Sequence, residues 1–141
     1  AMRREWSAWD LTTPENIRVE VKCAAYLQNW KQNSPPVIRF GIQSTRRWDA
    51  TSGEYDSESK RQADYYVFCL FKPQERRTAN PLQIEQWAFY VLSANILNAN
   101  CPSQKSIGLP KLIALGARER SWEELSRYPF ERSNDAETGD N

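Results

Sequence analysis

The pattern of apolar and polar residues is clearest near the start of the chain. Residues 17–22 alternate strictly between apolar and charged side chains, in the order Ile17, Arg18, Val19, Glu20, Val21 and Lys22. Successive side chains of a β-strand point to opposite faces, so this alternation predicts a strand with one buried face and one charged face. Residues 6–11 predict a preceding strand, and the Pro and Asn within residues 12–16 predict a turn between the two.

Longer apolar segments predict the centre of the fold. Residues 63–71 are almost continuously apolar, which is typical of a strand that is covered on both faces. Residues 37–42 and 87–93 predict two further strands, and residues 94–100 predict a short helix. The composition of residues 23–30 also favours a helix. Residues 105–116 fit a strand followed by a helical turn, but periodicity alone does not decide this.

Polar segments separate these elements. Residues 43–62 are rich in Ser and Asp and predict a long exposed loop, and residues 73–81 predict another. Ser121 and Glu124 have the spacing of a capping box, which predicts a helix that begins after Ser121 and stops before Pro129.

The order of the elements favours an α/β fold. It predicts a single domain over residues 3–130, built on a mixed β-sheet with helices packed against it. Residues 131–141 contain one Arg and four acidic residues and predict a disordered acidic tail. The tail has a net charge of −3 and the whole chain has +1, so residues 1–130 carry +4. A mildly basic body is compatible with a nucleic-acid partner without demanding one.

Composition restricts the chemistry that the chain can perform. Its 141 residues include no histidine. This excludes Ser-His-Asp and Cys-His catalysis by this chain, histidine-based metal sites and nuclease mechanisms with a histidine base. Catalysis would therefore use carboxylates, Lys, Tyr, Ser or Cys, or a metal ion held by oxygen ligands. The odd number of cysteines without CxxC spacing favours a reducing, cytoplasmic location over a disulfide framework: Cys23, Cys69 and Cys101.

Asp10, Glu20 and Lys22 form the candidate site. In a hairpin that pairs Leu11 with Ile17, Asp10 and Glu20 would be diagonal neighbours on one face, about 7–8 Å apart at Cα. Two carboxylates at that separation can hold one cation, and Mg²⁺ prefers such oxygen ligands together with water and phosphate. The ion would polarise a phosphoryl oxygen and activate water, while Lys22 would orient that water or stabilise charge on the phosphate.

A plainer interpretation is that these charges form ordinary ion pairs. Charged residues alternate with apolar ones on any half-exposed strand, and Glu20 and Lys22 could simply pair with each other on one face. Asp64 begins the buried strand at residues 63–71, where an unpaired charge would be costly. We therefore expect it to have a basic partner, either Arg61 or Arg18.

Residues 43–62 contain a second candidate surface. Trp48 and Tyr55 could stack on bases, or could anchor the loop to the body. Four cations could contact DNA phosphates or could be solvated residues beside the acidic ones: Arg46, Arg47, Lys60 and Arg61.

The candidate site resembles a known family. Asp10, a turn and then "VEVK", with Glu20, Val21 and Lys22, resembles the PD-(D/E)XK, or restriction-endonuclease-like, nuclease superfamily. The pattern of that superfamily is an acidic residue, a spacer and (D/E)-X-K on the next strand. The segment "AAYLQNW" is also similar, and its Gln28 matches a functional Gln of some members. Together, "VEVKCAAYLQNW", "RQADYYVFCLF" and "WAFYVLSANIL" resemble a group of uncharacterised bacterial proteins with that nuclease fold.

The resemblance implies a fold, an activity and a set of site residues. The fold would be a restriction-endonuclease-like mixed sheet flanked by helices, with the usual N-terminal helix short or missing. The activity would be divalent-metal-dependent hydrolysis of DNA by an endonuclease. Asp10 and Glu20 would bind Mg²⁺ or Mn²⁺, with the backbone carbonyl of Val21 as a further ligand. Lys22 would orient water or phosphate, and Gln28 would contact DNA or support the site.

Other functions remain open at this stage. The same fold without its first helix could be catalytically inactive and bind DNA or a protein partner, and exposed aromatic residues could form a homodimer. No apolar run approaches the roughly 20 residues of a membrane span, so we expect no membrane partner. DNA is the expected partner.

Overall fold

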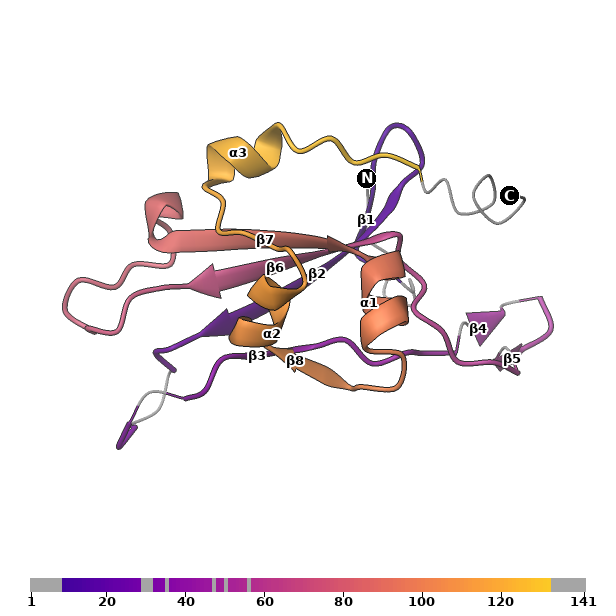
Figure 1. Ribbon diagram of the computed structural model, residues 1–141, viewed down its shortest axis with the longest axis horizontal. Helices are drawn as coiled ribbons and strands as arrows, with labels where there is room; N and C mark the ends of the chain where they lie inside the picture. Colours follow the sequence, from indigo (N-terminus) through magenta and orange to yellow (C-terminus); the bar gives the residue numbers. More distant parts are fainter. Residues whose placement is uncertain are drawn as a thin grey trace.

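A mixed sheet of four strands lies at the centre of the fold (Figure 1). The structure is a computed structural model that describes residues 9–28, 32–34, 36–46, 48–49, 51–55 and 57–132. The strands lie across the sheet in the order β1 (Leu11–Thr12), β2 (Arg18–Ala25), β6 (Tyr65–Phe71) and β7 (Trp87–Ser93). β2 is antiparallel to β1 and parallel to β6, and β7 is antiparallel to β6. The expected α/β class and mixed sheet are confirmed, in one small domain.

Both faces of this sheet are covered. On one face, the side chains of β6 and β7 join a large core with residues from later elements: Tyr66, Phe68, Leu70, Ala88, Tyr90 and Leu92. The alternate residues of the same strands face the other way and form a smaller cluster: Val67, Cys69, Phe89 and Val91. The expectation that residues 63–71 form a strand covered on both faces is therefore confirmed, because six of the seven residues of β6 are buried.

Different elements cover the two faces (Figure 1). The larger core contains side chains from the ribbon of β3 (Arg39–Gly41) and β8 (Ser106–Gly108), and from helices α1 (Ala94–Asn100) and α2 (Leu109–Ala114). Helix α3 (Trp122–Ser126) and the residues after it cover the smaller cluster. A 3₁₀ turn, η1 (Ile84–Gln86), leads into β7.

Several sequence predictions are confirmed. β7 and α1 occupy residues 87–93 and 94–100 as expected, and residues 105–116 do contain a strand followed by a helix. The capping box is present, because Ser121 accepts from the Glu124 amide and Glu124 accepts from the Ser121 amide. The loop at residues 43–62 contains a short hairpin of β4 (Trp48–Asp49) and β5 (Glu54–Tyr55).

The helix expected at residues 23–30 is wrong over the part that the structure describes. β2 continues through Ala25, and Cys23, Ala24 and Ala25 pair with the last three residues of β6. Composition favoured a helix, but pairing with a buried strand in the sheet decides the conformation. Residues 29–31 lie outside the described residues, as do residues 6–8 of the expected first strand and residues 133–141 of the expected tail.

No helix in the described part of the chain is both long and apolar enough to cross a membrane.

Arg61 forms hydrogen bonds with three parts of the chain: the segment after β3, helix α1, and the segment between α1 and β8. The residue is only 7% exposed. Its guanidinium donates to the carbonyls of Ile42 at 2.7 Å and Cys101 at 2.6 Å, and to the side chain of Asn98 in α1 at 2.9 Å. It also donates to the Gln104 carbonyl at 3.2 Å. A buried cation that satisfies so many acceptors is a structural residue, which explains why Arg61 is not available to bind phosphate.

We expect the Arg61→Met substitution to destabilise the protein strongly. It removes four hydrogen bonds from a charged donor and leaves buried carbonyls unpaired, so the free energy of unfolding should fall by about 2–4 kcal/mol. Urea unfolding followed by tryptophan fluorescence measures this change. Arg77→Met is the matched control, because the Arg77 side chain is 85% exposed. Equal stabilities of the two variants would contradict the role assigned to Arg61.

Candidate functional site

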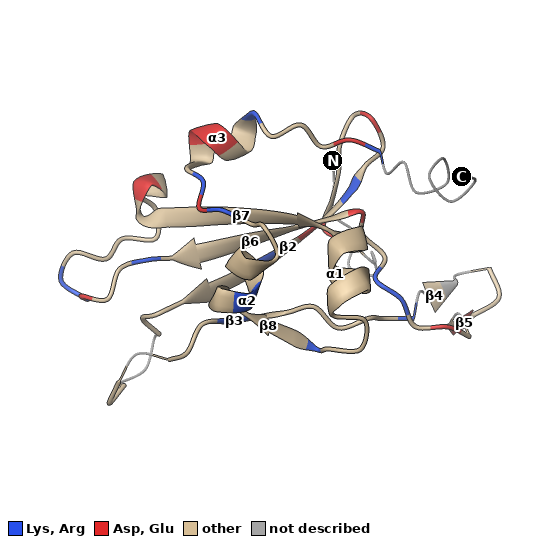
Figure 2. Ribbon diagram, in the orientation of Figure 1, with Lys and Arg blue, Asp and Glu red and all other residues tan. Residues whose placement is uncertain are grey.

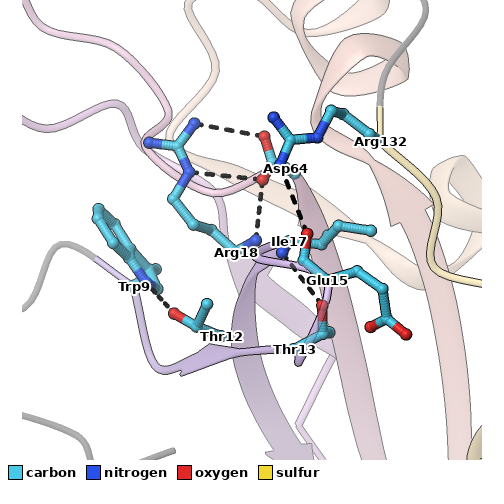
Figure 3. A network of polar contacts seen from close by, with 8 residues as sticks. All are labelled: Trp9, Thr12, Thr13, Glu15, Ile17, Arg18, Asp64 and Arg132. Carbon is cyan, nitrogen blue, oxygen red and sulfur yellow. Dashed lines mark hydrogen bonds and ion pairs between the residues drawn. The ribbon is translucent and has the colours of Figure 1, made fainter.

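The turn between β1 and β2 connects Asp10, just before β1, to Glu20 on β2, and side-chain contacts stabilise this turn (Figure 3). The Thr13 hydroxyl accepts from the Ile17 amide at 3.1 Å, and Asn16 has a left-handed φ of 67°, which Asn tolerates better than most residues. The Trp9 indole donates to the Thr12 hydroxyl at 2.8 Å. The Arg18 guanidinium lies 5.0 Å from the centre of the Trp9 ring.

A half-buried contact between Arg18 and Asp64 fixes β2 against β6 beside this turn (Figure 3). Asp64, just before β6, accepts from the Arg18 amide at 2.8 Å and from its guanidinium at 3.3 and 3.4 Å. The Asp64 amide in turn donates to the Arg18 carbonyl at 2.8 Å. Of the two expected partners of Asp64, the structure therefore selects Arg18.

The register of β1 and β2 differs from the expected one. Leu11 pairs with Val19 instead of Ile17, a shift of two residues. A shift of two keeps every side chain on its expected face, whereas a shift of one would have reversed the faces. Continuing this register places Asp10 opposite Glu20, closer than the expected diagonal arrangement.

Asp10 is held against the edge of β2 by its backbone and its side chain. Its amide donates to the Val19 carbonyl at 3.1 Å. Its carboxylate Oδ2 accepts from the Val21 amide at 2.8 Å. The Asp10 side chain is also hydrogen-bonded to the Glu20 side chain. The two carboxyl groups therefore meet, as the candidate site requires.

Glu20 titrates near neutral pH. Its pKa is raised to about 7, chiefly by burial and then by the hydrogen bond and negative charge of Asp10, against the opposing effect of Lys22. Lys22 Nζ lies 3.4 Å from Glu20 Oε2, and the side chains are 34% and 20% exposed respectively. Both the ion pair and the carboxyl pair expected from the sequence are thus present, and they share Glu20.

Tyr66 is a neighbour of the site that the sequence analysis missed. It pairs with Glu20 across the parallel strands β2 and β6. Burial and the charge of Glu20 raise the pKa of Tyr66 to about 12, so its phenol remains protonated at neutral pH. The two residues are 46 positions apart in the sequence, so only the strand pairing reveals the contact.

The oxygen atoms at this edge could serve as metal ligands. In a strand, the amide and carbonyl of one residue point to the same side. Because the Val21 amide reaches Asp10, the Val21 carbonyl also points to the edge where Asp10 lies. Within the described residues, no group of three or more His, Cys, Asp or Glu side chains could hold a metal. An ion here would rely on two carboxylates, a backbone carbonyl and water, which is how Mg²⁺ is commonly bound.

Gln28 does not join the other predicted site residues. Its side chain donates to the Ala25 carbonyl at 2.9 Å, beyond the end of β2. Five residues of strand separate Ala25 from Glu20, a distance of about 16 Å. The Gln28 carbonyl accepts from Arg76 at 2.7 Å, so Gln28 helps to fix the end of the strand.

The aromatic pair of the 43–62 loop lies on the exposed hairpin. Trp48 and Tyr55 are cross-strand partners, 41% and 56% exposed, with ring centres 5.1 Å apart. The Arg46 guanidinium lies 5.6 Å from the centre of the Tyr55 ring. Arg47 lies outside the described residues.

We expect Glu20→Gln to stabilise the folded protein more at pH 8 than at pH 5. The folded pKa of Glu20 lies above its ordinary value of 4.5, so the folded state binds the proton more tightly than the unfolded state does. Wild-type stability therefore falls as pH rises from about 4.5 through 7, and Gln removes this loss while it still donates to Asp10. The gain should be roughly 2 kcal/mol larger at pH 8.

Urea unfolding at the two pH values measures the difference. Glu15→Gln, which removes a carboxylate at an exposed position in the β1–β2 turn, is the matched control. A gain for Glu20→Gln that is the same at both pH values would contradict the shared proton.

No protein-family model matches the chain, and neither curated proteins nor solved structures give a match to it.

Proposed function

We propose that this chain is a divalent-metal-dependent deoxyribonuclease with a restriction-endonuclease-like fold. The observation that carries the proposal is the meeting of Asp10, Glu20 and Lys22 at one edge of β2. These residue types, at these positions, are the ones that the resemblance assigns to metal and phosphate chemistry. The mixed sheet supports the fold assignment, since Asp10 immediately precedes β1 and the Glu20-Val21-Lys22 segment lies on the next strand.

Each residue would have a separate role. A bound Mg²⁺ or Mn²⁺ would act as a Lewis acid and lower the pKa of water for attack on a phosphodiester. Asp10 and Glu20 would hold the ion together with the Val21 carbonyl. Lys22, now 3.4 Å from Glu20, would be free to contact phosphate or water once Glu20 binds the ion.

The raised pKa of Glu20 makes ion binding sensitive to pH. With a pKa of about 7, Glu20 holds its proton about half the time at neutral pH. A cation must displace that proton before both carboxylates can bind it. The proposed site is therefore a proton-binding pair without the ion and a metal-binding pair with it.

A basic ribbon supports DNA as the substrate. We use this name for the exposed cations Arg39 of β3, Lys105 before β8 and Lys111 of α2. Residues 97–118, which contain two of them, include no acidic residue. Figure 2 shows these cations around α2, β3 and β8, whereas acidic residues gather on α3 and η1. The strands β3 and β8 cover the same sheet face that bears Glu20 and Lys22, so the cations of the basic ribbon could contact phosphates beside the proposed site.

The β4–β5 hairpin offers a second contact to DNA. It lies in the connection between β2 and β6, and the Thr45–Lys60 bridge closes its base. The chain then enters β6 beside Arg18, at the start of β2 where the carboxylates lie. Trp48 and Tyr55 could therefore stack on bases near the scissile phosphate.

We expect Asp10→Asn to abolish ion binding and Lys22→Met to abolish cleavage while it preserves ion binding. The Asn oxygen can still accept from the Val21 amide, and Met keeps the apolar stem of Lys, so both variants should fold. Nicking of plasmid DNA with Mg²⁺ or Mn²⁺ should fall by at least about 10²-fold in each. Electron paramagnetic resonance of Mn²⁺ measures ion binding separately, and wild-type affinity should fall by about tenfold for each pH unit below 7.

The outcomes of this experiment separate the functions. Cleavage that persists in both variants would contradict the proposed site. If wild-type protein binds DNA but cuts it with neither ion, the catalytically inactive binding module is the better explanation. Glu15→Gln, which lies in the turn and away from the carboxylates, should cleave as wild type does.

We expect neutralisation of the basic ribbon to weaken DNA binding and its salt dependence. The triple substitution Arg39→Gln, Lys105→Gln and Lys111→Gln should reduce the slope of log K against log salt by about 2–3, since each phosphate contact contributes about 0.9. The matched control changes three cations that pair with acidic residues elsewhere: Lys72, Arg118 and Arg127. An equal loss in both triple variants would show that net charge alone drives binding.

A further inference from the structure

Two of the three cysteines lie opposite each other in the central sheet. Cys23 of β2 pairs directly with Cys69 of β6, across parallel strands. Their side chains point to the same face of the sheet, because directly paired residues of neighbouring strands share a face. Both thiols are reduced in the structure. Neighbouring strands lie about 4.8 Å apart, within the Cα separation of about 4.4–6.8 Å that a disulfide spans.

The two thiols differ in access. Cys23 is exposed, whereas Cys69 is buried among Val67, Phe89 and their neighbours. Cys69 also borders an apolar cavity of about 460 Å³ beneath α3, together with Val21. The cavity gives the Cys69 side chain room to adjust when a bond forms. The Cys23 thiol can therefore react with an oxidant in solution, and the Cys69 thiol lies next to it on the neighbouring strand.

We propose that Cys23 and Cys69 are a reversible peroxide-sensitive pair that forms a cross-strand disulfide. A peroxide oxidises the Cys23 thiol to a sulfenic acid and is itself reduced to water or alcohol. The Cys69 sulfur then attacks the Cys23 sulfur, the S–O bond breaks, and the oxygen leaves as water with the proton of Cys69. Overall, two thiols lose two electrons and two protons, and the peroxide accepts them.

The bond would link β2 to β6 one residue beyond Lys22. The Cys23 sulfur would be open to reductants in solution, and disulfides that are exposed have comparatively high reduction potentials, which suits a regulatory pair better than a permanent cross-link. A reducing compartment, which the odd number of cysteines favours, would keep both cysteines as free thiols. The proposed oxidation does not depend on the proposed nuclease activity. It is measured by counting free thiols in the protein alone, without DNA.

The test is a thiol count after treatment with hydrogen peroxide. Unfolding in the presence of a maleimide-linked polyethylene glycol should show three free thiols in the untreated protein and one after oxidation. The intact monomer should lose the mass of two hydrogen atoms, and peptide mapping should join Cys23 to Cys69. Dithiothreitol should restore all three thiols.

Two variants make the result specific. Cys23→Ser, at an exposed position, should keep both remaining thiols in the monomer under the same treatment. Cys101→Ala, which removes a cysteine that is 2% exposed, should still lose both remaining thiols. The proposal is overturned if wild-type monomer keeps three thiols, if it only gains oxygen atoms, or if oxidation only joins two molecules through Cys23.

Discussion

The parallel pairing of β2 with β6 is the constraint on which the rest of the structure depends. A parallel pair cannot be closed by a tight turn, so the chain must return to the starting end of β2 before β6 begins. The connection between β2 and β6 contains β3 and the β4–β5 hairpin. Near its C-terminal end, Arg61 donates a hydrogen bond to α1. The ion pair of Arg18 and Asp64 then aligns the two strand starts.

The same pairing sets the electrostatics of the site. Glu20 lies beside the phenol of Tyr66 on the face that carries the larger core, so burial acts on the carboxyl group from one side and Asp10 acts from the other. Lys22 alone does not offset these effects, which is why the pKa of Glu20 stays near 7. A carboxyl group in this position is kept at a cost in stability.

Local patterns predicted the local features of this structure. The alternation at residues 17–22 identified the face shared by Glu20 and Lys22, the apolar run identified β6, and the capping box identified the start of α3. Features that depend on distant pairing could not be read from the sequence. The continuation of β2 to Ala25, the contact of Glu20 with Tyr66 and the meeting of Cys23 with Cys69 all arise from residues more than 40 positions away. The shifted register kept Asp10 and Glu20 on one face because the shift was an even number of residues.

The hydrogen bond from the Val21 amide to Asp10 has a consequence for ion selectivity. One carboxylate oxygen of Asp10 is already engaged by the backbone, which disfavours binding of an ion through both oxygens of that group. Ca²⁺ often uses such bidentate carboxylates to reach seven or eight ligands, whereas Mg²⁺ accepts single oxygens in a compact octahedron completed by water. The rigid edge of β2 would therefore favour the smaller ion at the proposed site through geometry alone.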